Sequence, residues 1–261
     1  YLRGEKIFDA GDFPGMRALR FAHGETRAFV LRHLDDEVKK KRHATIAHWI
    51  TATLDTDAAG VAVLAAPHFE KAGMADRAGR AYLEAARHEM GQARTESALH
   101  YAQRALELLV PEELARRLDA MFIEGSSLHT LGRYDEALAV FTRVLAASFR
   151  LGARGKGGAA LNRIARVHRA RGEDERAHAV LIRALDLFRG AGDLRGVAAT
   201  LDDLAQIVRL RGDLDGAMGA ASEALQIRQG HGDARGEAVS LMTIAGIEHS
   251  RGNLEAAMRA A

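Results

Sequence analysis

A period of 40 residues runs through the C-terminal part of this 261-residue chain, and it restricts the fold more than any other feature. The apolar and small residues of 161–165 recur at 201–205 and at 241–245. Each copy is followed at a fixed interval by a glycine and then by an alanine: Gly172, Gly212 and Gly252, then Ala177, Ala217 and Ala257. Matching residues stand one period earlier, at Met121 and Gly125. A fixed period of this length predicts an array of stacked structural repeats.

Each period reads as two helices. Small and apolar residues occupy positions i, i+3, i+4 and i+7 from Leu201, and a second helical stripe begins at Ala217. Between them, Gly212 suits the left-handed end of a helix and Asp213 suits the cap of the next one. The residue at 125, 165, 205 and 245 is always small, which predicts close approach of the partner helix. We therefore expect hairpins of helices about 16 residues long, from about residue 57 to 261.

Composition agrees with packed helices and excludes several classes of protein. Alanine is abundant and there are only 3 prolines. The chain has no cysteine, so it has no disulfide framework, and it has no apolar run of bilayer length. A net charge of +2 gives no general reason to expect a nucleic-acid or membrane partner. We expect a cytoplasmic protein.

The repeat resembles the tetratricopeptide repeat (TPR). The resemblance covers residues 114–261 and reaches 73–110, and its unit is 40 residues instead of 34, as in long-repeat arrays of bacterial regulators. It is carried by these residues and their equivalents: Leu161, Ile164, Ala165, Gly172, Ala177, Leu181 and Ala184. The resemblance implies an all-α fold, a right-handed superhelix of stacked antiparallel helix hairpins, in which the first helix of each hairpin lines a concave groove.

The N-terminal third departs from the repeat. Residues 5–8 and 17–21 read as strands around a Gly- and Pro-containing turn, and residues 24 to about 54 read as helical. The basic run 39–42 could be a nucleic-acid patch. Acids at 35, 36 and 37 stand four residues before the lysines at 39, 40 and 41, so three i,i+4 pairs favour a solvated, self-neutralised helix instead.

The order of motifs in this region resembles the segment that follows the ATPase module of bacterial signal-transducing STAND-class NTPases. The anchors are Phe21-Ala22-His23, Arg27, Leu34, His43, Ile46-Ala47, Ala66-Pro67-His68, Ala72-Gly73 and Arg104-Ala105-Leu106. In that class a winged-helix domain precedes TPR-like repeats, and the ATPase is often fused to a serine/threonine kinase or a nucleotide cyclase. The resemblance implies three parts: 1–56, the end of a winged-helix-like domain with a β-hairpin; 57–110, divergent helical hairpins; and 111–261, regular repeats. The chain starts with Tyr1 and its last hairpin is cut short at Ala261, so we expect a fragment of a larger protein.

The sequence contains no complete catalytic or ligand-binding motif. Gly155-Lys156-Gly157 lacks the other residues of a phosphate loop, and the 12 histidines do not form a zinc-ligand pattern. No serine stands in a nucleophile elbow. We expect no catalytic residue, no metal and no cofactor in this chain, although its parent protein could be a kinase, cyclase or ATPase.

One basic stretch stands out as a candidate binding surface. Residues 150–171 hold seven Lys or Arg and no acid. Counting from Leu161, the residues that would line the groove are Phe122, His129, Asn162, Arg166, Arg169, Asp202, Gln206, Arg209, Met242 and His249. Arginine offers forked donors to carboxylates, so a protein or peptide partner with an acidic or extended segment fits this surface. Asp202 is expected to pair with Arg166 or Arg169, and the alternative is an Arg-rich solvated face.

Two functions of different kinds remain open. The first is a TPR scaffold that senses or docks a protein or peptide for a signalling ATPase. The second is the repeat region of a transcription regulator whose DNA-binding domain lies outside this chain. An enzyme housed within these residues is a third interpretation, and the absence of chemical motifs disfavours it.

Overall fold

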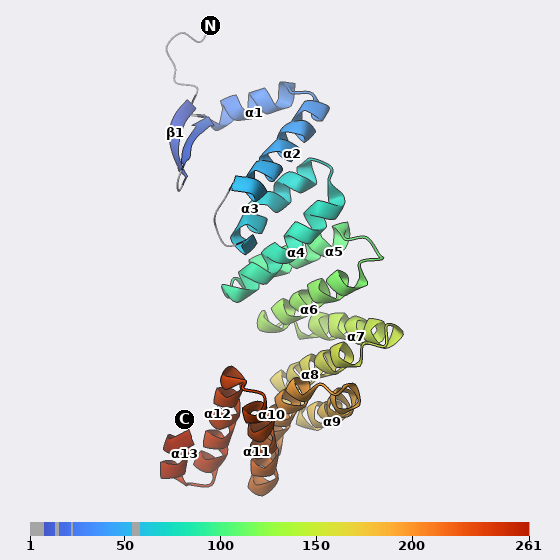
Figure 1. The fold of residues 1–261 in the computed structure, drawn as a ribbon, viewed down its shortest axis with the longest axis vertical. Helices are drawn as coiled ribbons and strands as arrows, with labels where there is room; N and C mark the ends of the chain where they lie inside the picture. Colours follow the sequence, from blue (N-terminus) through green and yellow to red (C-terminus); the bar gives the residue numbers. More distant parts are fainter. Residues whose placement is uncertain (1–7, 14–15, 22, 54–57, 261) are drawn as a thin grey trace. The chain divides into compact units, whose positions relative to one another are not determined.

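The computed structural model describes residues 8–13, 16–21, 23–53 and 58–260, and in these residues two strands and thirteen helices form (Figure 1). The chain divides into two compact units, residues 1–85 and 86–261. The boundary falls inside helix α4 (Ala75–Gly91). The three-part division at residues 56 and 110 stays a prediction.

The first unit begins with an antiparallel pair of strands, β1 (Phe8–Phe13) and β2 (Met16–Phe21), with Phe8 opposite Phe21. The first strand was expected at 5–8. Residues 5–7 lie outside the described part, and the strand instead takes in Gly11–Phe13, which had been assigned to the turn. Pairing along β2 satisfies the backbone of these residues, and this outweighs their weak local preference for a strand.

Three helices follow in this unit: α1 (Gly24–His33), α2 (Asp36–Thr53) and α3 (Ala58–Lys71). Residues 24–53 are helical as expected, with one break at 34–35. Leu34 is extended there, and the Asp35 carboxylate accepts a hydrogen bond from the Glu37 amide at 2.8 Å, which starts a new helix. Helices α2 and α3 pack through Ala47, Ile50 and Ala65. Helix α1 has no buried residue among those described, so the structure does not support a winged-helix domain with its own core.

The second unit is a stack of antiparallel helix hairpins, as predicted. The second unit starts with the last part of α4, which is followed by α5 (Thr95–Leu108). Four regular hairpins then follow: α6 with α7, α8 with α9, α10 with α11, and α12 with α13 (Figure 1). Their bounds are α6 Leu114–Thr130, α7 Tyr134–Arg150, α8 Arg154–Ala170, α9 Asp174–Ala191, α10 Leu194–Leu210, α11 Leu214–Gly230, α12 Ala234–Ser250 and α13 Leu254–Ala260. The first helices of successive hairpins also touch one another, α6 on α8, α8 on α10 and α10 on α12.

The predicted stop-and-restart signals appear where expected. Gly212 has a φ of 87°, which an L side chain rarely adopts, and the Asp213 carboxylate accepts a hydrogen bond from the Gly216 amide at 2.8 Å. Asp193 and Asp233 cap α10 and α12 in the same way. These local signals fix the hairpin geometry of each period.

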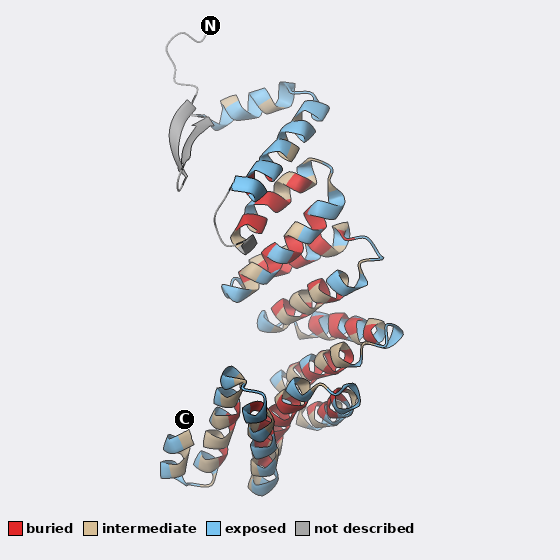
Figure 2. Cartoon of the chain, viewed as in Figure 1, coloured by how far each residue is buried: buried red, intermediate tan, exposed pale blue. Residues whose placement is uncertain are grey.

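The core of the second unit runs between the helices without a break from Leu99 to Ala224 (Figure 2). Arginines at one position of the repeat also join neighbouring hairpins: Arg171 pairs with Asp135, Arg211 with Glu175 and Arg251 with Asp215. Because each acid is exposed, each pair contributes at most about 1 kcal/mol. Apolar packing is therefore the main source of stability.

Gly125 shows why a small residue is needed on the inner face of each first helix. A Cβ atom at this position would lie 2.7 Å from the ring of Phe141 on the partner helix. We expect Gly125→Leu to lower the free energy of unfolding by about 1–3 kcal/mol, because the helices must separate or Phe141 must leave its rotamer. Urea unfolding followed by circular dichroism measures the change. Gly219→Leu is the matched control, since no atom lies within 4 Å of its Cβ position; an equal loss in both variants would contradict the packing argument.

Candidate binding groove

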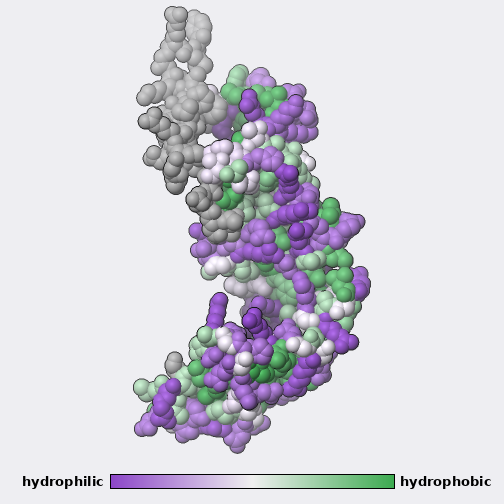
Figure 3. Space-filling model, in the orientation of Figure 1, coloured by the Kyte–Doolittle hydropathy of each residue, from purple (hydrophilic) through white to green (hydrophobic). Residues whose placement is uncertain are grey.

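The first helices of the hairpins line a groove in the second unit. Two adjoining cavities of about 520 and 510 Å³ lie along it. His129 of α6 and Arg166 of α8 line both cavities, so the groove is continuous across these helices. Figure 3 shows the second unit hollowed on one side, with hydrophilic side chains at the hollow. Three of the predicted groove helices therefore form one surface.

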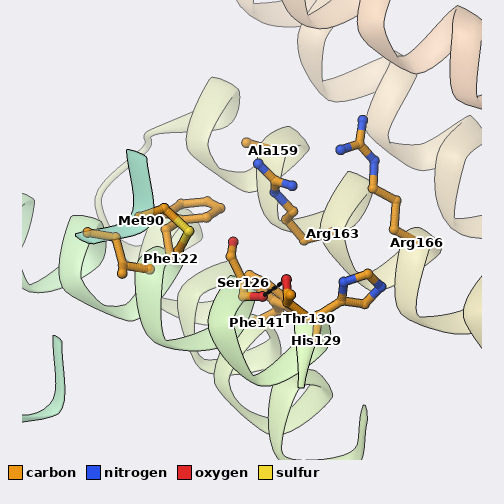
Figure 4. A pocket seen from close by; sticks show the side chains of 10 residues that line it. Met90, Phe122, Ser126, His129, Thr130, Phe141, Ala159, Arg163 and Arg166 are labelled. Atoms are coloured by element: carbon orange, nitrogen blue, oxygen red, sulfur yellow. Dashed lines mark hydrogen bonds between the residues drawn. The ribbon is translucent and has the colours of Figure 1, made fainter. Parts of the chain in front are cut away.

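The first cavity combines an apolar wall with two guanidinium groups. Met90, Phe122, Ile123, Phe141 and Ala159 supply the apolar atoms. In Figure 4, Met90 and Phe122 lie on one side of the cavity, and Arg163 and Arg166 lie on the other. The rings of Phe122 and Phe141 are tilted against each other with centroids 6.2 Å apart, which fixes this wall. Such a site can hold an apolar side chain and an anionic group together.

Arg163 carries the available positive charge of this cavity. In the part of the chain that the structure describes, no hydrogen bond or ion pair engages its guanidinium. Desolvation, followed by the neighbouring Arg166 and opposed by Asp203, lowers the pKa of Arg163, but an arginine in this setting remains protonated. An anion placed here would relieve the repulsion between the two arginines.

His129 adds an uncharged polar group at the junction of the two cavities. Burial, opposed by a backbone interaction with Arg166 and reinforced by the nearby arginines 163, 166 and 169, lowers the pKa of its imidazole and favours the neutral ring. Its Nε2 atom is buried and has no hydrogen-bond partner among the described residues. A bound segment could supply that partner.

Most polar side chains that line the second cavity bond to one another. Arg166 donates to the Asp203 carboxylate at 3.0 Å, and Arg169 donates to the Gln206 side chain at 2.5 Å. The expected pairing of Arg166 or Arg169 with Asp202 is therefore wrong. Asp202 lines the same cavity but pairs with Arg228 of α11 at 2.7 Å.

Asp202 and Arg228 form a buried ion pair where α10, α11 and α12 meet. The two residues are 3% and 7% exposed, and Ser240 donates to the same carboxylate oxygen of Asp202 at 3.2 Å. The other oxygen, Oδ1, is buried without a partner among the described residues. Burial, opposed by Arg228, raises the pKa of Asp202 to about 6. Asp202 therefore links α10 to α11 of its own hairpin and to α12 of the next.

Asn162 occupies the equivalent place one repeat earlier. Its amide donates to the Thr200 hydroxyl at 2.9 Å, and Asn162 and Thr200 stand 40 residues before Asp202 and Ser240. The position therefore forms a polar bridge between successive first helices and is buried in both copies. Met242 at the next equivalent position is 70% exposed.

The remaining predicted residues lie along α10 and α12. Arg209 donates to Ser250 at 2.9 Å, and His249 is exposed. The acid-free stretch 150–171 is partly neutralised by acids from other helices, since Lys156 binds Asp119 at 2.8 Å. A local charge count could not show these partners, which stand about one repeat away in the chain. The count of groove positions from Leu161 left out Arg163, although its place three residues before Arg166 puts it on the same helix face.

The described part of the chain offers no cluster of three His, Cys, Asp or Glu residues that could hold a metal ion. No described helix is both long enough and apolar enough to cross a membrane.

Comparison with known families gives a match at the centre of the array. The model of the tetratricopeptide repeat matches residues 158–230, from within α8 to the end of α11. Residues 158–230 are tetratricopeptide repeats. The TPR resemblance is thus confirmed over two hairpins, α8/α9 and α10/α11, and the 40-residue register relates the hairpins on either side to them. A search of curated protein sequences gave no match.

Solved structures share the fold at low sequence identity. The apo form of RapI has 15% identity and a TM-score of 0.63, with 87% of this chain and 95% of that chain covered. Aspartyl phosphate phosphatase F from Bacillus subtilis has 13% identity and a TM-score of 0.64, with 90% and 72% covered. A STAND protein with a TPR sensor from Pyrococcus horikoshii has 15% identity and a TM-score of 0.63; 90% of this chain is covered, but only 38% of that protein. These similarities concern the helical-repeat fold.

Proposed function

We propose that this chain is a protein- or peptide-binding TPR scaffold whose groove receives an extended segment of its partner. The observation that supports this most directly is the first cavity, where the unpaired Arg163 faces an apolar wall. A bound carboxylate would accept charge-assisted hydrogen bonds from this guanidinium, which has no ion-pair partner among the described residues.

The partner segment that fits has an apolar side chain beside an acidic one. The apolar side chain would enter the wall at Phe122, and the acid would bind Arg163, with Arg166 and Arg169 next along the groove. Arg166 is bound to Asp203, but it is partly exposed and could turn toward a better ligand. Gln206 and His129 could bind the backbone of the segment.

We further propose that the scaffold serves as the sensor or docking module of a larger bacterial signalling ATPase in the cytoplasm. Two observations support this: the motif order of residues 21–106, and the common fold with the TPR-containing STAND protein. In that setting the groove would report the presence of a partner to the ATPase.

Arg163→Ala tests the groove. Peptides selected from a random displayed library against the intact chain provide the probes, and their affinities are measured by calorimetry. We expect Arg163→Ala to weaken acidic binders at least about tenfold, because a charge-assisted hydrogen bond is worth about 1.5–3 kcal/mol. The melting temperature is expected to stay close to that of the wild type, since Arg163 makes no hydrogen bond or ion pair in the described structure.

Arg183→Ala is the matched control, since Arg183 is an exposed arginine on the second helix α9 and does not line either cavity. It is expected to leave the affinity unchanged. The proposal fails if the selection yields no binder, or if the binders are equally sensitive to both substitutions.

A further inference from the structure

A strongly basic cavity of about 570 Å³ lies in the first unit, away from the groove residues in the sequence. Helices α1, α2 and α3 all contribute to it, and its one acid is Asp36. The basic side chains that line it are Arg27, Arg32, Lys39, Lys40 and Lys71. It therefore concentrates positive charge from segments up to 44 residues apart in the chain.

Ion pairs account for only part of this charge. Lys39 pairs with Asp36 and Lys40 pairs with Glu37, each at 2.8 Å. These are i,i+3 pairs, so the predicted i,i+4 pairing of this helix is wrong. Asp35 is instead used to cap α2, which moves the pairing by one residue.

Three cations of the cavity are left without a carboxylate among the described residues. Arg27 and Lys71 make no ion pair or hydrogen bond there, and the Nε of Arg32 donates only to the Ala28 carbonyl at 3.4 Å. Arg27 and Arg32 lie on α1, and Lys71 ends α3. The excess charge therefore comes from two different helices that face one cavity.

His43 lies close enough to these cations for them to shift its pKa. Its Nδ1 lies 2.9 Å from Nδ1 of His68, so a single proton is shared by this contact. Burial, then Lys71 and Arg27, lower the pKa of His43. Apart from Asp36, which is paired with Lys39, the groups that line the cavity with it or contact it are positive or neutral: Arg27 on α1, Lys39 and Lys40 on α2, and His68 and Lys71 on α3.

We propose that this cavity binds a compact oxyanion with at least two negative charges, such as a phosphate group. Arg27 and Arg32 offer planar sets of N–H donors, and Lys71 offers a mobile point charge, which together match the oxygens of such an anion. A nucleic-acid strand would need a basic stripe along the surface rather than side chains that converge on one cavity. This site is independent of the proposed groove.

Calorimetric titration of the intact chain with inorganic phosphate and with pyrophosphate tests the site, at an ionic strength held constant with chloride. The double variant R27Q/K71Q removes the two cations that have no partner. The control K41Q/R42Q removes the same charge from exposed positions of α2 that do not line the cavity. We expect R27Q/K71Q to weaken pyrophosphate binding at least about tenfold, and the control to change it less than about twofold.

A spectroscopic measurement gives a second readout. Bound pyrophosphate should raise the pKa of His43, followed by NMR of the imidazole, in the wild type and the control but not in R27Q/K71Q. Circular dichroism confirms that both variants are folded. The proposal is overturned if neither anion binds in the presence of chloride, or if both double variants lose affinity equally. It is also overturned if a single-stranded oligonucleotide binds more tightly than pyrophosphate and depends equally on both pairs.

Discussion

Asp202→Ala is expected to lower the free energy of unfolding by about 3–5 kcal/mol, because it leaves the buried guanidinium of Arg228 without its carboxylate. The substitution also removes the acceptor of the Ser240 hydroxyl, which links α12 to α10. One side chain thus joins three helices of two repeats. Urea unfolding at pH 7.5, above the pKa of about 6 for Asp202, measures the effect with the pair ionised.

A double substitution separates two costs of Asp202→Ala: the loss of packed atoms, and the unpaired buried charge of Arg228. In Asp202→Leu with Arg228→Met, no buried charge remains, and we expect most of the lost stability to return. Glu223→Ala is the control, because its pair with Arg189 is about half exposed on both sides, and we expect it to cost at most about 1 kcal/mol. If Asp202→Ala costs no more than Glu223→Ala, the buried pair does not hold these repeats together.

Phe188→Ala is the second substitution expected to have a large effect, at about 3–5 kcal/mol. The ring of Phe188 on α9 is 3% exposed and lies against two glycines of the neighbouring first helices, Gly158 of α8 and Gly196 of α10. A Cβ on Gly158 would already lie 2.8 Å from this ring. Removing the ring therefore opens a cavity between two hairpins, and rigid helices cannot close around it completely.

Phe149→Ala provides the comparison, since Phe149 lies in the last turn of α7 and its side chain is 55% exposed. We expect its unfolding free energy to stay within about 0.5 kcal/mol of the wild type. Both variants are measured by urea unfolding with the same probe. Similar small losses at the two positions would show that the interface around Phe188 is loosely packed.

Local sequence signals predicted the hairpins because each signal acts within a few residues. Gly212 ends a helix through its own backbone freedom, and Asp213 starts the next one through its own side chain. The small residue at 125 was likewise recognisable, because its position in the repeat recurs. Such features need no knowledge of distant contacts.

The N-terminal unit shows where local reasoning fails. Asp35 could either pair with Lys39 or cap a helix, and the cap is what forms. The same limit affected the groove, because helical spacing places Asn162 and Arg166 on one face but does not show which neighbour each meets. Asn162 is buried against Thr200, whereas Arg166 stays partly exposed.

The repeat length, the helix ends and the stacking of hairpins could be predicted from local sequence, because a 40-residue period and its glycines and aspartates encode them. Which charges of the groove are neutralised depended on how the hairpins pack. Residues about one repeat apart in the chain become neighbours across the first helices, so Arg166 meets Asp203 and Asp202 meets Ser240. Arg228 reaches Asp202 from the second helix of the same hairpin. Arg163 remains without a partner for the same reason: a charge is satisfied by what packs beside it in space.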